Sequence, residues 1–167
     1  MSERIEKRVG EALRESGATV ATAESCTGGL VCSLLTDIPG SSGYVDRGFV
    51  TYAYDAKRAM LGVSREVLEE HGAVSEPVAR EMARGARDVA DVTWGVSTTG
   101  IAGPSGGTDD KPVGTVFIGI AYAASWESGD SYVTVSRHEF NGTRKEIKEK
   151  IARQTLSDLL TEIERLT

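Results

Sequence analysis

Helix-like and strand-like segments alternate along the whole chain of 167 residues. Apolar side chains spaced three or four apart predict amphipathic helices over residues 2–16 and 76–90, with short strand-like runs between the helices. Near the end of the chain, residues 113–123 and 131–140 form two consecutive strand patterns, which predict a hairpin. This order predicts an α/β fold, a single-domain three-layer α/β/α sandwich with a mixed β-sheet.

The remaining elements follow from the same patterns and from residues that start or stop a helix. Gly17 stops the first helix, and Ser64 and Ser75 are expected helix N-caps. Further strands are expected at residues 19–23, 48–54 and 94–97, and further helices at residues 27–35, 55–61 and 147–166.

Length and composition indicate one globular domain over residues 1–167, because 40% hydrophobic content supplies a core that smaller pieces would lack. The net charge of −6 opposes binding to nucleic acid or to an anionic membrane surface. No apolar run approaches the roughly 20 residues that span a bilayer, and the start of the chain lacks a signal-peptide core. We therefore expect a cytoplasmic protein that binds neither nucleic acid nor membranes.

The chain has two cysteines, Cys26 and Cys32, and two histidines, His71 and His138. Their spacings match neither a zinc site nor a disulfide framework. We expect no metal site, no disulfide and no cofactor. Cys26 fits a thiol nucleophile less well than a small buried residue at a helix start.

Residues 23–29, Ala-Glu-Ser-Cys-Thr-Gly-Gly, follow a strand-like run at the point where a helix is expected to begin. Ser25 would then lie at a strand-to-helix corner, where the first backbone N–H groups of the helix can hold a phosphate or an oxyanion. Ser25 is therefore a candidate nucleophile. A plain N-cap, followed by glycines that permit close packing, fits the same residues.

A second group of small residues, 98–108, also follows a strand-like run, so the two loops are expected to share one cleft. Backbone N–H groups of residues 103–108 can surround a phosphate or a ribose, although their spacing is not that of a P-loop. The acidic pair Asp109 and Asp110 fits a solvated loop tip better than a magnesium site. Long glycine-rich loops of this kind are commonly functional.

A serine nucleophile needs a base that takes the hydroxyl proton. Neither histidine lies in a catalytic-triad motif, so a lysine is the alternative base. Lys57 is the candidate, because it lies five residues after Tyr52, at the start of a short helix that follows a strand. If it is partly desolvated, its neutral form is accessible near neutral pH and can accept the proton, with the Tyr52 hydroxyl relaying or positioning it. Taken alone, Lys57 also fits a solvated surface charge and Tyr52 a packing residue.

Several motifs occur in a characteristic order along the chain. They comprise residues 23–29, 48–63, 71–76, 99–108 and 111–116. With these motifs the chain resembles the C-terminal domain of the competence/damage-inducible protein CinA, a family whose members include nicotinamide-nucleotide amidases. The resemblance covers nearly the whole sequence.

The resemblance implies hydrolysis of nicotinamide mononucleotide to nicotinate mononucleotide and ammonia, with no cofactor. It places Ser25, Lys57 and Tyr52 in catalysis. The residues expected to bind this small nucleotide are Thr27, Gly28, Gly29, Thr99, Gly106, Gly107 and Arg144. The Arg144 guanidinium would face the anionic part of the substrate through paired hydrogen bonds, although a first-turn arginine is also commonly just exposed.

The chain departs from the family pattern at Ala53, Tyr54, Ser105 and Thr143. Positions 53, 54 and 143 lie beside expected site residues and bear on the choice of substrate. An amidase for another small carboxamide, or a nucleotide-binding or interaction module without turnover, therefore remains an alternative. The apolar stripe of the last helix favours a homo-oligomer.

Overall fold

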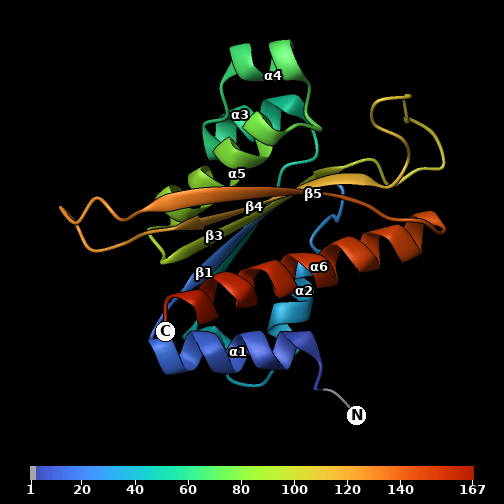
Figure 1. Ribbon diagram of the computed structural model, residues 1–167. Helices are drawn as coiled ribbons and strands as arrows, with labels where there is room; N and C mark the ends of the chain where they lie inside the picture. The colour runs from blue at the N-terminus through green and yellow to red at the C-terminus, as the bar shows by residue number, and fades with distance from the viewer. Residues whose placement is uncertain (1–2) are drawn as a thin grey trace.

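The computed structural model describes residues 3–167 and has a five-stranded sheet with the strand order β2-β1-β3-β4-β5 (Figure 1). The strands are β1 (Val20–Glu24), β2 (Val45–Val50), β3 (Trp94–Gly100), β4 (Thr115–Tyr122) and β5 (Tyr132–Glu139). The helices are α1 (Ile5–Ser16), α2 (Leu30–Thr36), α3 (Tyr54–Leu61), α4 (Arg65–His71), α5 (Glu76–Ala90) and α6 (Arg144–Arg165), with a 3₁₀ turn at Ser41–Gly43.

The direction of the strands brings several loops to one edge of the sheet. Strands β2, β1 and β3 are parallel, whereas β4 runs antiparallel to both β3 and β5. The carboxyl ends of β1, β2, β3 and β5 therefore share an edge with the start of β4 and the start of α6. The chain leaves β1 toward β2 on one side and reaches β3 on the other, and such a switch point is where open α/β sheets bind ligands.

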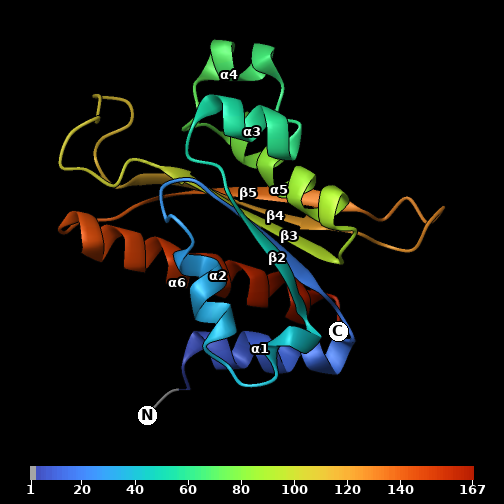
Figure 2. The same ribbon diagram turned by 180° about the vertical axis from the view of Figure 1, so that it is seen from behind.

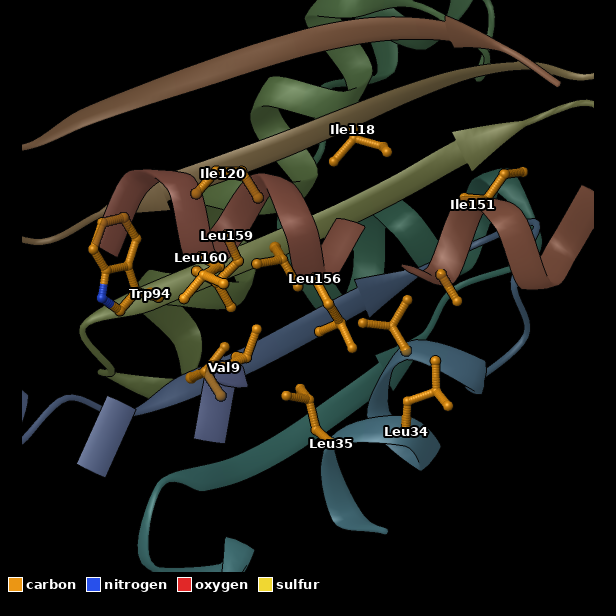
Figure 3. Packing of buried hydrophobic residues seen from close by; sticks show 14 of the residues in the cluster. Val9, Leu34, Leu35, Trp94, Ile118, Ile120, Ile151, Leu156, Leu159 and Leu160 are labelled. Atoms are coloured by element: carbon orange, nitrogen blue, oxygen red, sulfur yellow. The ribbon is translucent and has the colours of Figure 1, made fainter. Parts of the chain in front are cut away.

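Helices cover both faces of the sheet, which confirms the predicted three-layer architecture. Figures 1 and 2 show α1, α2 and α6 on one face and α3, α4 and α5 on the other. The first face holds the larger apolar cluster, in which Trp94, Ile118 and Ile120 of the sheet meet Leu156 and Leu159 of α6 (Figure 3).

The opposite face of the sheet carries small residues, so α5 packs close to the strands. Gly95 of β3 lies directly under α5, and a Cβ atom added there would stand 2.2 Å from the carbonyl oxygen of Ala83. The apolar stripe of α5, including Val78 and Met82, completes this second core. The backbone of α5 is thereby held close to the middle of the sheet.

Most predicted elements are confirmed, including α5 at residues 76–90 and the N-caps Ser64 and Ser75, which accept hydrogen bonds from Val67 N and Val78 N. The strand predicted at 48–54 is wrong in its bounds, because β2 ends at Val50 and the chain then turns toward α3. The predicted start of the first helix, residue 2, lies outside the described residues. Within residues 3–167, no helix combines the length and apolar character that crossing a bilayer requires.

Candidate active site

Ser25 directly follows β1 at the carboxyl edge of the sheet. Its backbone N–H donates to the carbonyl of Thr98 on β3 (3.0 Å), which holds the turn against the neighbouring strand. Ser25 does not cap a helix, because α2 begins later, with Gly29 as its N-cap and no side chain in the capping role. The Ser25 hydroxyl instead accepts a hydrogen bond from the Lys57 ammonium group, with an Oγ to Nζ distance of 2.9 Å.

Lys57 extends from α3 and is completely buried, so the surface-charge interpretation of this residue is wrong. Besides Ser25, its Nζ donates to the backbone carbonyls of Thr51 (2.7 Å) and Tyr52 (3.2 Å). Burial disfavours the charged form and lowers the pKa of Lys57 to about 8. When Nζ is neutral, its two protons can stay on the carbonyls, and the lone pair then faces the Ser25 hydroxyl.

Tyr52 and Arg144 form the rim of the site. Tyr52 lies in the loop between β2 and α3 with 63% of its surface exposed, and its hydroxyl accepts a hydrogen bond from Arg144 Nη2 at 3.1 Å. Arg144, the first residue of α6, also donates to the carbonyl of Gly103. The backbone carbonyl of Tyr52, and not its hydroxyl, is the group that contacts Lys57.

A cavity of about 250 Å³ opens at this edge of the sheet. The predicted site residues that border the cavity are Ser25, Tyr52, Lys57, Thr99, Gly106 and Arg144. Thr99 donates its hydroxyl proton to the carbonyl of Ala73 (2.7 Å), so its oxygen can act toward any other group only as an acceptor. The glycine-rich loop after β3 contributes Gly103 and Ser105 to the same wall.

The predicted residues Thr27, Gly28, Gly29 and Gly107 do not border this cavity. The Thr27 hydroxyl is buried and donates to the carboxylate of Glu24, while Gly28 N–H donates to the carbonyl of Ser25. Gly29 N–H donates to Glu24 Oε1. The N–H groups of the two glycines are therefore occupied within the protein, and contact of these four residues with a substrate stays a prediction.

Glu24 is a residue that the sequence analysis missed. It ends β1, is only 1% exposed, and holds the first N–H groups of α2: Val31 N at 2.9 Å from Oε1 and Cys32 N at 3.0 Å from Oε2. The sequence carries a signal for it, because an acidic residue at the end of an otherwise apolar strand must find donors if it is buried. The positive end of α2 is thus occupied by the protein's own carboxylate.

Cys26 borders the cavity beside Ser25 but is not activated. Burial raises the pKa of its thiol to about 12, so the thiolate is scarce at neutral pH. This agrees with its interpretation as a buried small residue. Among residues 3–167, no group of three or more His, Cys, Asp and Glu side chains is arranged to hold a metal ion.

Sequence comparison extends this picture to known proteins. Residues 2–163 match the family described as the CinA C-terminal domain. The chain belongs to this family. The crystal structure of the competence/damage-inducible protein CihA from Agrobacterium tumefaciens resembles this CinA C-terminal domain with a TM-score of 0.87 and 41% sequence identity, covering 96% of each chain. The competence damage-inducible protein A from Klebsiella pneumoniae resembles it with a TM-score of 0.90 and 31% identity, covering 98% of this chain and 97% of the other.

The chain aligns with most of the length of one relative but with only about a third of the length of another. It is 48% identical over 156 residues to the nicotinamide-nucleotide amidohydrolase PncC from Escherichia coli, covering 93% of this chain and 90% of the relative. It is 49% identical over 157 residues to the CinA-like protein of Chlorobium limicola. That alignment covers 94% of this chain but only 36% of the longer relative.

Proposed function

We propose that this chain hydrolyses the carboxamide of nicotinamide mononucleotide, a small-molecule nucleotide, to give nicotinate mononucleotide and ammonia. The observation that carries the proposal is the buried contact of 2.9 Å between Lys57 Nζ and Ser25 Oγ at the floor of the cavity. The similarity to the amidohydrolase of Escherichia coli supports the choice of substrate. A homo-oligomeric state and a cytoplasmic location stay predictions.

The geometry suits a serine amidase with a lysine base. Neutral Lys57 takes the proton of Ser25 while Oγ attacks the carboxamide carbon, and the resulting tetrahedral intermediate carries a negative oxygen. Protonated Lys57 then gives its proton to the leaving nitrogen, so that ammonia departs and an acyl-enzyme remains. Water attacks this ester with Lys57 again acting as the base, which releases the carboxylate and restores Ser25.

Several backbone N–H groups near Ser25 already donate hydrogen bonds within the protein, which limits the groups that can donate to the negative oxygen. Because Glu24 and Ser25 accept from Gly28, Gly29 and Val31, these N–H groups are not available. Cys26, directly after the nucleophile, borders the cavity. We assign its backbone N–H as the donor to the oxyanion. In this proposal Tyr52 and Arg144, which are hydrogen-bonded to each other at the rim, orient the ribose phosphate, and the guanidinium pairs with its anionic oxygens.

Ammonia release from nicotinamide mononucleotide, measured with EDTA present, tests this function. We expect release from the mononucleotide, and slower release from nicotinamide riboside and free nicotinamide, because these lack the phosphate that Arg144 would hold. Faster release from a different carboxamide would identify another amidase substrate. Binding of the mononucleotide without release would contradict the proposal and favour the binding module.

The rate of hydrolysis should depend on pH through Lys57. The groups that surround its Nζ are Ser25, two backbone carbonyls and the Cys26 thiol, and Cys26 stays protonated because its pKa is raised to about 12. Only neutral Lys57 accepts a proton, so kcat/KM should rise about tenfold per pH unit from pH 6 and level off above about pH 8.

The measurement is the kcat/KM profile from about pH 6 to about pH 9 in buffers of constant ionic strength. An inflection near pH 6.5, the ordinary histidine range, would instead identify a histidine as the base. A flat profile would show that no group with a pKa near 8 acts as the base, and would therefore exclude Lys57.

A further inference from the structure

Glu24 does not border the cavity, but it makes hydrogen bonds both to the segment that follows Ser25 and to Thr51, which contacts Lys57. Its carboxylate accepts four hydrogen bonds, and all four donors belong to the segment that follows Ser25. These donors are the Thr27 hydroxyl and the backbone N–H groups of Gly29, Val31 and Cys32. A carboxylate suits this position because it offers only acceptors.

The same residue also reaches the base through its backbone. The carbonyl of Glu24 accepts a hydrogen bond from Thr51 N–H (2.8 Å), and the carbonyl of Thr51 in turn accepts from Lys57 Nζ (2.7 Å). Glu24 thereby holds the turn after Ser25 with its side chain. With its main chain it holds Thr51, whose carbonyl accepts a hydrogen bond from Lys57. Thr98 adds a link across to β3, because its hydroxyl lies 2.8 Å from that of Thr27 and its carbonyl holds Ser25 N–H.

We propose that Glu24 is a positioning residue that sets the orientation of the Ser25 hydroxyl relative to Lys57. This inference rests on the proposed role of Ser25 as the nucleophile. A misplacement of about 1 Å between reacting groups lowers a rate by about 100-fold. The dependence of the turn on a single buried carboxylate therefore makes catalysis sensitive to Glu24 even though substrate does not touch it.

Glu24→Gln tests the proposal, because the amide keeps the size of the side chain but turns one acceptor into a donor that faces other donors. We expect kcat for nicotinamide mononucleotide to fall about 10- to 100-fold while KM stays within about twofold. The matched control is Glu6→Gln. Glu6 is an equally buried carboxylate on α1, ion-paired with Arg153 (3.3 Å) far from the cavity, and its replacement should lower the melting temperature without lowering kcat.

A second readout does not depend on the substrate. Phenylmethanesulfonyl fluoride modifies activated serines: the Ser25 oxygen forms a bond to sulfur, the sulfur–fluorine bond breaks, fluoride leaves, and the serine proton passes to Lys57. Intact mass spectrometry should show that modification slows about 10- to 100-fold in Glu24→Gln and is unchanged in Glu6→Gln. Should Glu24→Gln fail to fold, Thr27→Val removes one donor to the carboxylate and should slow modification in the same direction.

The outcomes separate this inference from the proposed function. Wild-type rates in folded Glu24→Gln, or an equal loss in Glu6→Gln, would overturn the positioning role. In a third outcome, Glu24→Gln is modified more slowly than wild type, but neither protein releases ammonia from any nicotinamide compound. That result would support the positioning role and contradict the proposed substrate. A wild-type protein that neither releases ammonia nor is modified at Ser25 would overturn both.

Discussion

Replacement of Ser25 by alanine should lower the kcat of ammonia release from nicotinamide mononucleotide by at least about 1,000-fold. The substitution removes the atom that is proposed to form the acyl-enzyme, and the neighbouring thiol of Cys26 does not replace it, since burial raises the pKa of Cys26 to about 12. A loss of this size corresponds to about 4 kcal/mol of transition-state stabilisation. Substrate binding should persist, because the rim formed by Tyr52 and Arg144 is untouched.

The measurement pairs steady-state kinetics with calorimetric binding of the mononucleotide. Ser33→Ala is the matched control, because Ser33 is exposed on α2 and loses the same hydroxyl away from the cavity. Its kcat should equal that of the wild type. Retention of more than a tenth of the wild-type kcat in Ser25→Ala would show that water or another side chain attacks the carboxamide directly.

Replacement of Gly95 by alanine should destabilise the fold by about 3 kcal/mol or more. The added Cβ would stand 2.2 Å from the carbonyl oxygen of Ala83 and 2.7 Å from the backbone nitrogen of Arg87, both in α5. Neither atom is the end of a flexible side chain, so relief requires that the helix move away from β3 and open the second core. For a chain of this length we expect the melting temperature to fall by about 6 °C to 12 °C.

Gly43→Ala is the control for this prediction. Apart from Gly43 itself and its two chain neighbours, no heavy atom of residues 3–167 lies within 4 Å of a Cβ built on Gly43, and its φ is not among the positive values. Its free energy of unfolding should stay within about 0.5 kcal/mol of wild type in urea titrations. A melting temperature of Gly95→Ala within about 2 °C of wild type would show that α5 can shift without loss of packing.

The sequence was sufficient to predict the three-layer α/β/α architecture, because the apolar stripes of helices such as α5 and α6 depend only on the local spacing of apolar residues. It placed Ser25 at a strand end correctly but began the following helix three residues early. Gly28 and Gly29 adopt φ of 59° and 104°, which a right-handed α-helix does not accommodate, and the carboxylate of Glu24 accepts the N–H of Gly29. The conformation of this turn depends on its contact with the buried Glu24 carboxylate, and the spacing of residues in the sequence does not reveal that contact.

Long-range contacts explain the other differences. Thr51 and Tyr52 have strand-like side chains, yet β2 ends at Val50 because the next two carbonyls point to Lys57. Strand β3 continues to Gly100, past the predicted end at residue 97, because Thr98 to Gly100 pair with β4. The contact between Ser25 and Lys57 itself joins residues 32 positions apart, so residue types suggested the pair but could not show its geometry.

The two side chains that are proposed to react, Ser25 and Lys57, come from opposite sides of the sheet. The Ser25 turn leads into α2 in the layer with α1 and α6, whereas Lys57 stands on α3 in the layer with α4 and α5 (Figure 2). If either layer separates from the sheet, the serine loses its base and becomes as unreactive as a serine in water. If Ser25 and Lys57 react as proposed, only a molecule in which both layers are docked on the sheet can hydrolyse an amide, so activity also reports complete folding of both layers.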